Sequence, residues 1–377
     1  MTAEVDPLLL ERVRARIADV GCEPSAAAVA AALREERGGL VPDVPAVVTA
    51  LTREIVGAGP LELLLADPLV TDVLVNGATE VWVDRGAGLE RTAVRFRDDA
   101  AVRRLAQRLA APSGRRLDDA QPWVDARLPD GTRLHAVLHP VAPGGTCLSL
   151  RVPRRRVFSL GELVDAGAVP PDGAQLLGRL VTSRTAFLVT GGTGTGKTTV
   201  LSALLSLVDP AERLLLVEDA AELRPDHPHV VRLEARPPNV EGAGEVTLRD
   251  LVRQALRMRP DRLVVGEVRG PEVAELLAAL NTGHDGGCGT LHANSAADVP
   301  GRLEALAAMA GMGREALHSQ LASALQVVVH LSRVAGCRRV AEVGVLVRGA
   351  DGLVRAEPAW SWDGAGPGRA RLTELVA

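Results

Sequence analysis

The chain has 377 residues, of which 47% are hydrophobic and 24% charged, and this is enough apolar material for two or three ordinary domains. Its 38 glycines and 24 prolines stay below the roughly 25–30% that marks low-complexity chains, which excludes collagen, a coiled coil and wholesale disorder. A formal charge of −4 and only 2% aromatic residues leave no electrostatic footprint and few stacking platforms for nucleic acid, so no nucleic-acid partner is expected.

The sequence carries no evident targeting segment. Residues 1–6 have neither a basic stretch nor an apolar run, so no secretory signal is expected. The uncharged runs 134–150 and 316–332 are interrupted by proline, glycine or polar residues and do not resemble a membrane span of ~20 apolar residues. The four cysteines lie far apart, which predicts neither a zinc site nor a disulfide framework. We therefore expect a cytoplasmic protein.

The first 152 residues divide into two patterns. Residues 1–56 are expected to form a helical extension, because Leu8, Leu9, Val13 and Ile17 follow helical spacing and an alanine-rich run covers 25–37. Residues 57–152 show short apolar runs separated by turns, which predicts a small α/β domain rich in antiparallel pairing. The expected strands are 69–75, 80–84, 93–96, 124–128 and 133–138, with turns at Asn76-Gly77 and Pro129-Asp130-Gly131.

Residues 153–160 form an expected charged linker, whose arginines are either a solvated hinge or a basic edge facing a phosphate or an acidic partner. In residues 161–377 apolar strands alternate with helices, which predicts a mostly parallel sheet covered on both faces. The expected strands are 186–190, 213–218, 263–266 and 289–292, and the expected helices are 198–208, 247–258 and 271–281.

Residues 191–198, called the P-loop below, match G-x-x-x-x-G-K-[ST] at every fixed position and lie between an expected strand and helix. In such a loop, glycines let successive backbone N–H groups cradle a polyphosphate at the positive end of a helix. Lys197, the only lysine of the chain, is expected to reach the β- and γ-phosphates, and the Thr198 hydroxyl to ligate Mg²⁺. The alternative is a chance glycine-rich turn. The expected residues for binding ATP and Mg²⁺ are Gly191, Gly192, Thr193, Gly194, Thr195, Gly196, Lys197, Thr198 and Thr199.

Three acidic or histidine-bearing segments accompany the later strands. Glu218 ends one strand, Glu267 follows another, and His284 and His292 flank a third. Because ligands bind at the carboxyl ends of strands in open α/β sheets, we expect these segments to converge on the P-loop. Taken singly, each is more simply explained as a surface acid or a satisfied histidine.

Together these motifs resemble those of the ATPases of type II and type IV secretion and type IV pilus systems. The resemblance is greatest to the CpaF-like ATPases of tight-adherence (Flp) pili, including actinobacterial members associated with conjugal transfer. It covers residues 57–345 and includes segments 72–77, 124–133, the P-loop and 257–269. It implies a RecA-like P-loop ATPase core with a smaller N-terminal, PAS-like α/β domain, assembled into a hexameric ring.

The resemblance also implies roles for individual residues. Glu218 corresponds to the Asp-box acid, a general base or water-positioning residue, and Glu267 to an atypical Walker B glutamate that acts on Mg²⁺ through water. His284 and His292 correspond to the His box, which senses phosphate and couples neighbouring subunits. Gly287 and Gly289 within that box, and Pro300 where a helix is expected to have begun, depart from the family pattern.

Arg133 and Arg151 correspond to arginines that approach the nucleotide, partly across subunit boundaries, the alternative being ordinary surface pairing. Arg127 and Arg269 are weaker candidates. The expected catalytic residues are therefore Lys197, Glu218, Glu267, His292, Arg133 and Arg151.

The implied function is an ATP-hydrolysing motor for pilus assembly or protein secretion. Such a motor docks on an inner-membrane platform protein and reaches the cytoplasmic face of the membrane only through that partner. One alternative is a DNA-transfer (conjugation) motor, suggested by the arginine clusters at 103–116 and 151–156. Another is a nucleotide-dependent scaffold or switch that hardly hydrolyses ATP.

Overall fold

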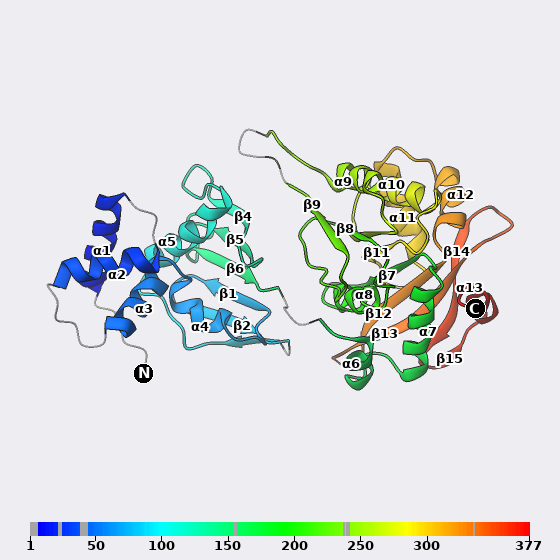
Figure 1. The fold of residues 1–377 in the computed structure, drawn as a ribbon, viewed down its shortest axis with the longest axis horizontal. Helices are drawn as coiled ribbons and strands as arrows, with labels where there is room; N and C mark the ends of the chain where they lie inside the picture. Colours follow the sequence, from blue (N-terminus) through cyan, green and yellow to red (C-terminus); the bar gives the residue numbers. More distant parts are fainter. Residues whose placement is uncertain are drawn as a thin grey trace. The chain divides into compact units, whose positions relative to one another are not determined.

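The computed structural model describes residues 7–21, 25–37, 44–86, 88–153, 157–236, 238, 242–334 and 336–377. The chain divides into two compact units, Met1–Arg155 and Arg156–Ala377, and Figure 1 labels their elements. The division falls within the expected linker, of which residues 154–156 lie outside the described part of the chain. The finer division between residues 56 and 57 stays a prediction.

In its described residues the N-terminal extension forms three helices with a small core of their own. They are α1 (Pro7–Val20), α2 (Ala26–Arg37) and α3 (Val44–Ile55). Leu9, Val13 and Ile17 are buried at intervals of four residues, whereas Leu8 is 69% exposed. The apolar stripe of α1 therefore begins at Leu9, and Leu8 does not belong to it.

The described part of the first unit also forms a six-stranded antiparallel sheet in the order β3-β2-β1-β6-β5-β4. Its strands are β1 (Asp72–Asn76), β2 (Glu80–Asp84), β3 (Leu89–Arg91), β4 (Trp123–Arg127), β5 (Arg133–Val137) and β6 (Cys147–Arg151). Alternate residues such as Val73, Leu134 and Leu150 are buried in one core with Val102 and Leu105 of α5 (Asp99–Ala110). The shorter helices are η1 (Gly59–Leu61), α4 (Glu62–Leu65) and η2 (Ala111–Ser113). This sheet, with one face on its core, has the expected antiparallel pairing of a small α/β domain, and its PAS-like character stays a prediction.

Most strands of this sheet match the sequence prediction, but residues 93–96 do not form a strand. The third strand is β3, and the chain then leaves the sheet edge: the Phe96 N–H bonds the Ala78 carbonyl, and the Asp98 side chain caps α5. The apolar pattern of 93–96 reflects packing of Phe96 against the core rather than strand pairing. The turns at Gly77 and Gly131, both with positive φ, join paired strands as predicted.

The described part of the second unit forms a nine-stranded sheet in the order β15-β14-β13-β12-β7-β11-β10-β8-β9. From β12 to β9 all neighbours are parallel, and β13 to β15 extend one edge with antiparallel pairs. The strands are β7 (Phe187–Gly191), β8 (Leu214–Glu218), β9 (Val230–Glu234), β10 (Arg262–Val268), β11 (Cys288–Leu291), β12 (Val327–Val334), β13 (Cys337–Arg348), β14 (Val354–Ser361) and β15 (Gly364–Ala365). The parallel part confirms the expected RecA-like core.

Helices cover both faces of this sheet, and each face has its own apolar core (Figure 1). One core includes α9 (Leu248–Ala255), α10 (Val273–Leu280), α11 (Val299–Met309) and α12 (Arg314–Ala324), with η3 (Leu256–Met258) packed beside it. The other includes α6 (Leu160–Asp165), α7 (Pro171–Thr182), α8 (Lys197–Leu205) and α13 (Arg369–Leu375). Pro300 lies in the first turn of α11, where proline is tolerated, so it marks the start of that helix. None of the helices in the described residues has the length and apolar character of a membrane span.

Gly289 offers a test of how tightly the central strands pack. It lies in β11 between β7 and β10, and a Cβ atom at this position would stand 2.5 Å from the Val265 carbonyl oxygen. We predict that Gly289→Ala lowers the free energy of unfolding by about 2 kcal/mol in urea titrations, because the strand must shift to admit a methyl group. The control is Gly178→Ala in α7, where an added Cβ would have no atom within 4 Å apart from its own helix backbone. Its free energy of unfolding is expected to rise by about 0.5–1 kcal/mol. Equal effects in the two variants would contradict the packing described.

Candidate nucleotide site

The P-loop adopts backbone conformations that favour glycine. Gly191, Gly194 and Gly196 have φ values of +146°, +70° and +98°, a region that side chains with a Cβ rarely adopt. At Gly191 an added Cβ would also stand 2.5 Å from the Leu331 carbonyl oxygen of the neighbouring strand β12. The loop geometry therefore requires glycine at these positions, which is the reason that the motif contains them.

The helix after the loop begins at Lys197 without a side-chain cap. Its first N–H groups have no partner within the helix, so an oxygen-rich ligand fits there. Gly192, Thr193 and Gly194 are exposed, and the Thr195 hydroxyl closes the loop by donating to the Gly192 carbonyl at 2.9 Å. These features fit a polyphosphate.

Lys197 lies inside the loop with its side chain largely covered. It is 8% exposed, and Nζ donates to the carbonyls of Gly191 (3.1 Å) and Gly192 (2.9 Å). Nζ also lies 3.3 Å from His292 Nε2. Burial lowers the pKa of Lys197, while the negative charge of Glu267 opposes this effect. The ammonium is thus held where phosphate oxygens are expected.

His292 and Arg269 both contact Glu267 at the ends of β10 and β11. His292 Nε2 lies 2.8 Å from Glu267 Oε1, and the Arg269 guanidinium bonds the other oxygen. Nε2 cannot donate to the carboxylate and accept from Lys197 at once, so the shorter contact assigns its proton toward Glu267. Burial, and then the charge of Lys197, lowers the pKa of His292, which favours this neutral form. The result is a polar network from the P-loop lysine to Arg269.

Glu218 ends β8 as a buried carboxylate. It is 3% exposed, and Oε1 accepts the backbone N–H groups of Glu222 and Leu223, both at 2.9 Å. Among the described residues, Oε2 is buried without a hydrogen-bond partner. Burial raises the pKa of Glu218 to about 7. A Cβ on Gly266 would stand 2.6 Å from Glu218 Cγ, so the glycine of β10 makes room for this side chain.

Three further residues belong to this region although the sequence analysis did not select them. Glu222 acts electrostatically on both Lys197 and Arg269. Arg338 of β13 donates from Nε to the Gly194 carbonyl at 2.9 Å, and His330 of β12 bonds Thr190, the residue before the P-loop. Glu222 follows Glu218 by only four residues, so proximity in the sequence was a usable signal. Arg338 and His330 reach the site only through long-range strand pairing.

The two histidines of the His box do not meet in this unit. His284 lies in the loop before β11, with Nδ1 3.2 Å from the Ala279 carbonyl at the end of α10. His292 follows the opposite end of β11, and β11 runs parallel to β7, which leads into the P-loop. The expectation that both histidines converge on the P-loop is therefore corrected: the structure brings only His292 there.

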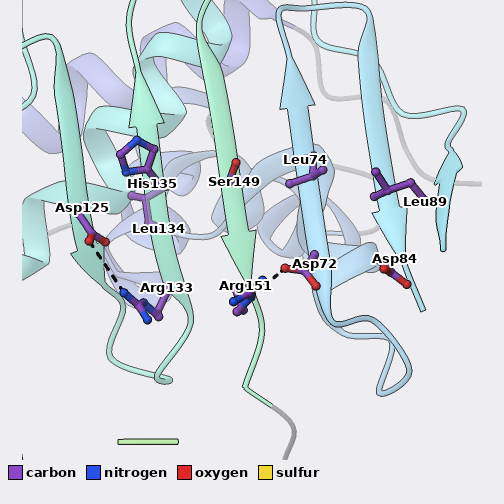
Figure 2. Close-up of a pocket in the computed structure, with 10 residues that line it drawn as sticks. All are labelled: Asp72, Leu74, Asp84, Leu89, Asp125, Arg133, Leu134, His135, Ser149 and Arg151. Atoms are coloured by element: carbon purple, nitrogen blue, oxygen red, sulfur yellow. Dashed lines mark hydrogen bonds and ion pairs between the residues drawn. The ribbon is translucent and has the colours of Figure 1, made fainter. Parts of the chain in front are cut away.

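Arg133 and Arg151 lie in the first unit, on the sheet face opposite its core. They are direct neighbours across β5 and β6, and they line a pocket with Asp72 and Asp125 (Figure 2). Arg151 Nε lies 3.1 Å from Asp72, and Arg133 lies 4.0 Å from Asp125. Within this unit each arginine thus forms an ordinary surface pair, the alternative to a role at the nucleotide. The approach of either arginine to a nucleotide stays a prediction.

The model of the type II/IV secretion system protein family matches residues 54–376. The chain belongs to the type II/IV secretion system protein family. Over 342 residues it is 58% identical to a Mycobacterium tuberculosis (strain H37Rv) protein with the provisional name conjugal transfer protein Rv3659c, covering 89% of this chain and 97% of that one. It is 30% identical over 284 residues to conjugal transfer protein TrbB of Rhizobium radiobacter, covering 74% and 84%.

The fold of the chain is also similar to a solved structure, the pilus retraction motor PilT with bound ADP. The TM-score is 0.53 at 20% identity, covering 79% of this chain and 81% of that one. This similarity confirms the expected fold class, an N-terminal α/β domain with a RecA-like core. The family match confirms the resemblance to the proteins of type II and type IV secretion systems, and the closer likeness to CpaF-like ATPases stays a prediction.

The raised pKa of Glu218 makes the free energy of unfolding depend on pH. Its folded pKa of about 7 lies above the ordinary value of 4.5, so the unfolded chain releases this proton first as pH rises. Stability is therefore lost as pH rises from the ordinary pKa to the folded one. We expect the wild type to lose about 3 kcal/mol relative to Glu218→Gln between about pH 5 and about pH 8, measured by urea unfolding.

The control for this comparison is Glu315→Gln, which changes an exposed carboxylate of α12. It is expected to follow the wild type at both pH values. A constant difference between the wild type and Glu218→Gln across this range would show that Glu218 is not a buried carboxyl of raised pKa.

Proposed function

We propose that this protein hydrolyses ATP at the P-loop and uses the energy to drive a membrane-bound transfer machine. The observation that carries the proposal is the contact of Lys197, His292 and Glu267 at the end of a glycine loop that fits a polyphosphate. Phosphoryl transfer depends on positioned charge more than on covalent chemistry, and these side chains supply it.

The proposed division of labour follows the contacts. Lys197 exchanges the loop carbonyls for the β- and γ-phosphate oxygens, and the first N–H groups of α8 bind the remaining oxygens. The Thr198 hydroxyl and the Glu267 carboxylate would hold Mg²⁺, Glu267 through water as the resemblance implies. Bound Mg²⁺ would neutralise charge on the transferring phosphoryl group.

Two carboxylates can orient the attacking water. A pKa of about 7 makes Glu218 able to accept a proton near neutral pH, and its Oε2 has no partner among the described residues. Glu222 is exposed and acts on Lys197. We assign water positioning to Glu218, as the resemblance implies, and treat Glu222 as the competing assignment.

Substitution of Lys197 tests hydrolysis itself. Lys197→Ala is expected to lower the steady-state rate of phosphate release from ATP about a hundredfold, because no other lysine can supply the lost charge. Arg179→Ala, an exposed change on α7, is the control and should keep the wild-type rate. A Lys197→Ala protein with wild-type turnover would refute the proposal, and tight ATP binding with no turnover by the wild type would favour the scaffold alternative.

Glutamine variants separate the two carboxylates. If Glu218 orients the water, Glu218→Gln should lower the rate constant of single-turnover ATP hydrolysis about a hundredfold, and Glu222→Gln should lower it clearly less. The reverse order would assign the role to Glu222 instead. Affinity for ADP, which needs no attacking water, is expected to stay unchanged in both variants and serves as the control for folding.

We further propose a ring, most simply a hexamer, in which Arg133 and Arg151 act on the nucleotide of a neighbouring copy. Their support is the resemblance and their position side by side on a sheet face away from the core. Mixing two inactive variants tests this. Lys197→Ala lacks a working loop and Arg133→Ala lacks the arginine, so mixed rings should regain phosphate release if the arginine acts across subunits. Failure of the mixture to exceed the sum of its components would exclude that arrangement.

The names of the relatives bear on what is moved. Two of them are named conjugal transfer proteins, one of them provisionally, and PilT is named a pilus retraction motor. We propose that this protein powers pilus assembly or protein secretion through an inner-membrane platform protein, in the manner of CpaF-like ATPases. The charge of −4 and the 2% of aromatic residues argue against direct contact with nucleic acid. The conjugation alternative would be favoured by ATPase stimulation by DNA that falls steeply with salt.

A further inference from the structure

The hairpin of β12 and β13 extends past the end of β7 and flanks the P-loop. β7 ends at Gly191, which lies opposite Leu331 of β12, whereas β12 continues to Val334 and stays paired with β13 over that length. In the sheet order, β12 and β11 lie on opposite sides of β7. The hairpin therefore approaches the P-loop from the side opposite to His292, which follows β11.

Two residues of the hairpin contact the loop. Arg338 of β13 donates from Nε to the Gly194 carbonyl at 2.9 Å, and its Cδ lies 3.7 Å from where a Cβ on Gly196 would stand. Leu331 of β12 lies along the same side, with its carbonyl oxygen 2.5 Å from the Cβ position of Gly191. The hairpin thus reaches each of the loop glycines that have positive φ.

The bond from Arg338 sets the orientation of one peptide plane of the loop. The Gly194 carbonyl and the Thr195 N–H belong to the same trans peptide, so they point in opposite directions. With the carbonyl on Arg338, the Thr195 N–H faces away from the hairpin. Gly194 is exposed, and apart from its chain neighbours no atom lies within 4 Å of where its Cβ would stand. Packing around Gly194 therefore does not hold this plane, and the bond to Arg338 does.

The orientation of this plane matters because backbone N–H groups of such a loop are the donors to a polyphosphate. A flipped plane would turn the Thr195 N–H toward the hairpin and present a carbonyl oxygen to the phosphate oxygens, which repel it. A guanidinium suits the task of preventing the flip. It stays protonated at every physiological pH, and its Nε–H has a fixed direction in the planar group.

We propose that Arg338 is a positioning residue of the nucleotide site, which holds the Gly194 carbonyl and thereby keeps the Thr195 N–H directed at the polyphosphate. The inference rests on the proposed binding of ATP at the P-loop and deepens it, since it names what holds one of the phosphate donors in place. Arg338 acts on the loop rather than on the reacting atoms, so its effect falls on the affinity for nucleotide.

Two substitutions of Arg338 separate the hydrogen bond from the charge. In Arg338→Gln the amide nitrogen takes the place of Nε, so the bond to Gly194 survives without the positive charge. Arg338→Met fills the same positions as far as Nε and loses both. In calorimetric titrations of the full chain with ADP and Mg²⁺, we expect Arg338→Met to bind about tenfold more weakly and Arg338→Gln to stay within about threefold of the wild type.

The matched control is Arg333→Met, which removes the exposed arginine opposite Arg338 on β12 and should leave the affinity for ADP unchanged. Wild-type affinity in Arg338→Met would overturn the proposal. Equal losses in Arg338→Met and Arg338→Gln would also overturn it, because they would show that the charge of the arginine acts on the phosphates directly.

Steady-state hydrolysis gives a second signature of a positioning role. We expect Arg338→Met to raise KM for ATP about tenfold and to change kcat less than about twofold, because the contacts among Lys197, His292 and Glu267 lie on the other side of the loop and stay intact. A fall in kcat at unchanged KM would contradict the proposal, since it would place the action of Arg338 in the chemical step.

Crystal structures of the nucleotide-free wild type and Arg338→Met supply a readout that needs neither hydrolysis nor binding. The Gly194 carbonyl should face Arg338 in the wild type, and the peptide between Gly194 and Thr195 should be flipped or take more than one orientation in the variant. A single, unchanged orientation in the variant would overturn the proposal. A wild type that showed this difference but did not hydrolyse ATP would refute the proposed function alone.

Discussion

The ammonium of Lys197 organises the site, because so many polar groups are arranged around one buried cation. Two loop carbonyls accept its hydrogen bonds. His292 lies next to the ammonium, and Glu267 contacts His292. Desolvation of a cation is unfavourable unless partners replace water, and here backbone oxygens and a nearby carboxylate do so. A polyphosphate can take over from the carbonyls without moving the lysine backbone. The loop is in this sense preorganised for binding a polyphosphate.

The parallel sheet explains how residues so distant in the sequence meet at this cation. Strands β7, β8, β10, β11 and β12 run in one direction, so their carboxyl ends lie along one edge. Four of these strands, β7, β8, β10 and β11, lead to the P-loop, Glu218, Glu267 and His292 in turn. Buried apolar strands provide the rigidity, and the short segments after them provide the chemistry. His330 lies within β12 and bonds Thr190, the residue before the P-loop.

Local motifs made much of this site predictable. The glycine pattern identifies the P-loop directly, and the rule that ligands lie at carboxyl ends of strands brings His292 and Glu267 to Lys197, as their contacts show. The role of Glu218 at the site stays a prediction. The same rule should have excluded His284, because that residue precedes its strand. Residues 93–96 show the limit of short apolar patterns, since one buried aromatic side chain imitates a strand.

Contacts made by strand pairing were not predictable in this way. Arg338 and His330 reach the P-loop because β12 and β13 pair beside β7, and no local pattern reveals which strands become neighbours. Glu218 was identified by its place after a strand, but its raised pKa depends on burial and on the room left by Gly266. Packing of this kind follows from tertiary structure alone.

The central claim is that Lys197 and the glycine loop recognise the β- and γ-phosphates of a nucleotide. Calorimetric titration of the wild type and Lys197→Ala with ATP and with AMP, each in the presence of Mg²⁺, tests it directly. We expect the wild type to bind ATP far more tightly than AMP and Lys197→Ala to lose most of this preference. Equal affinity of the wild type for the two nucleotides, or an undiminished preference in the variant, would contradict it.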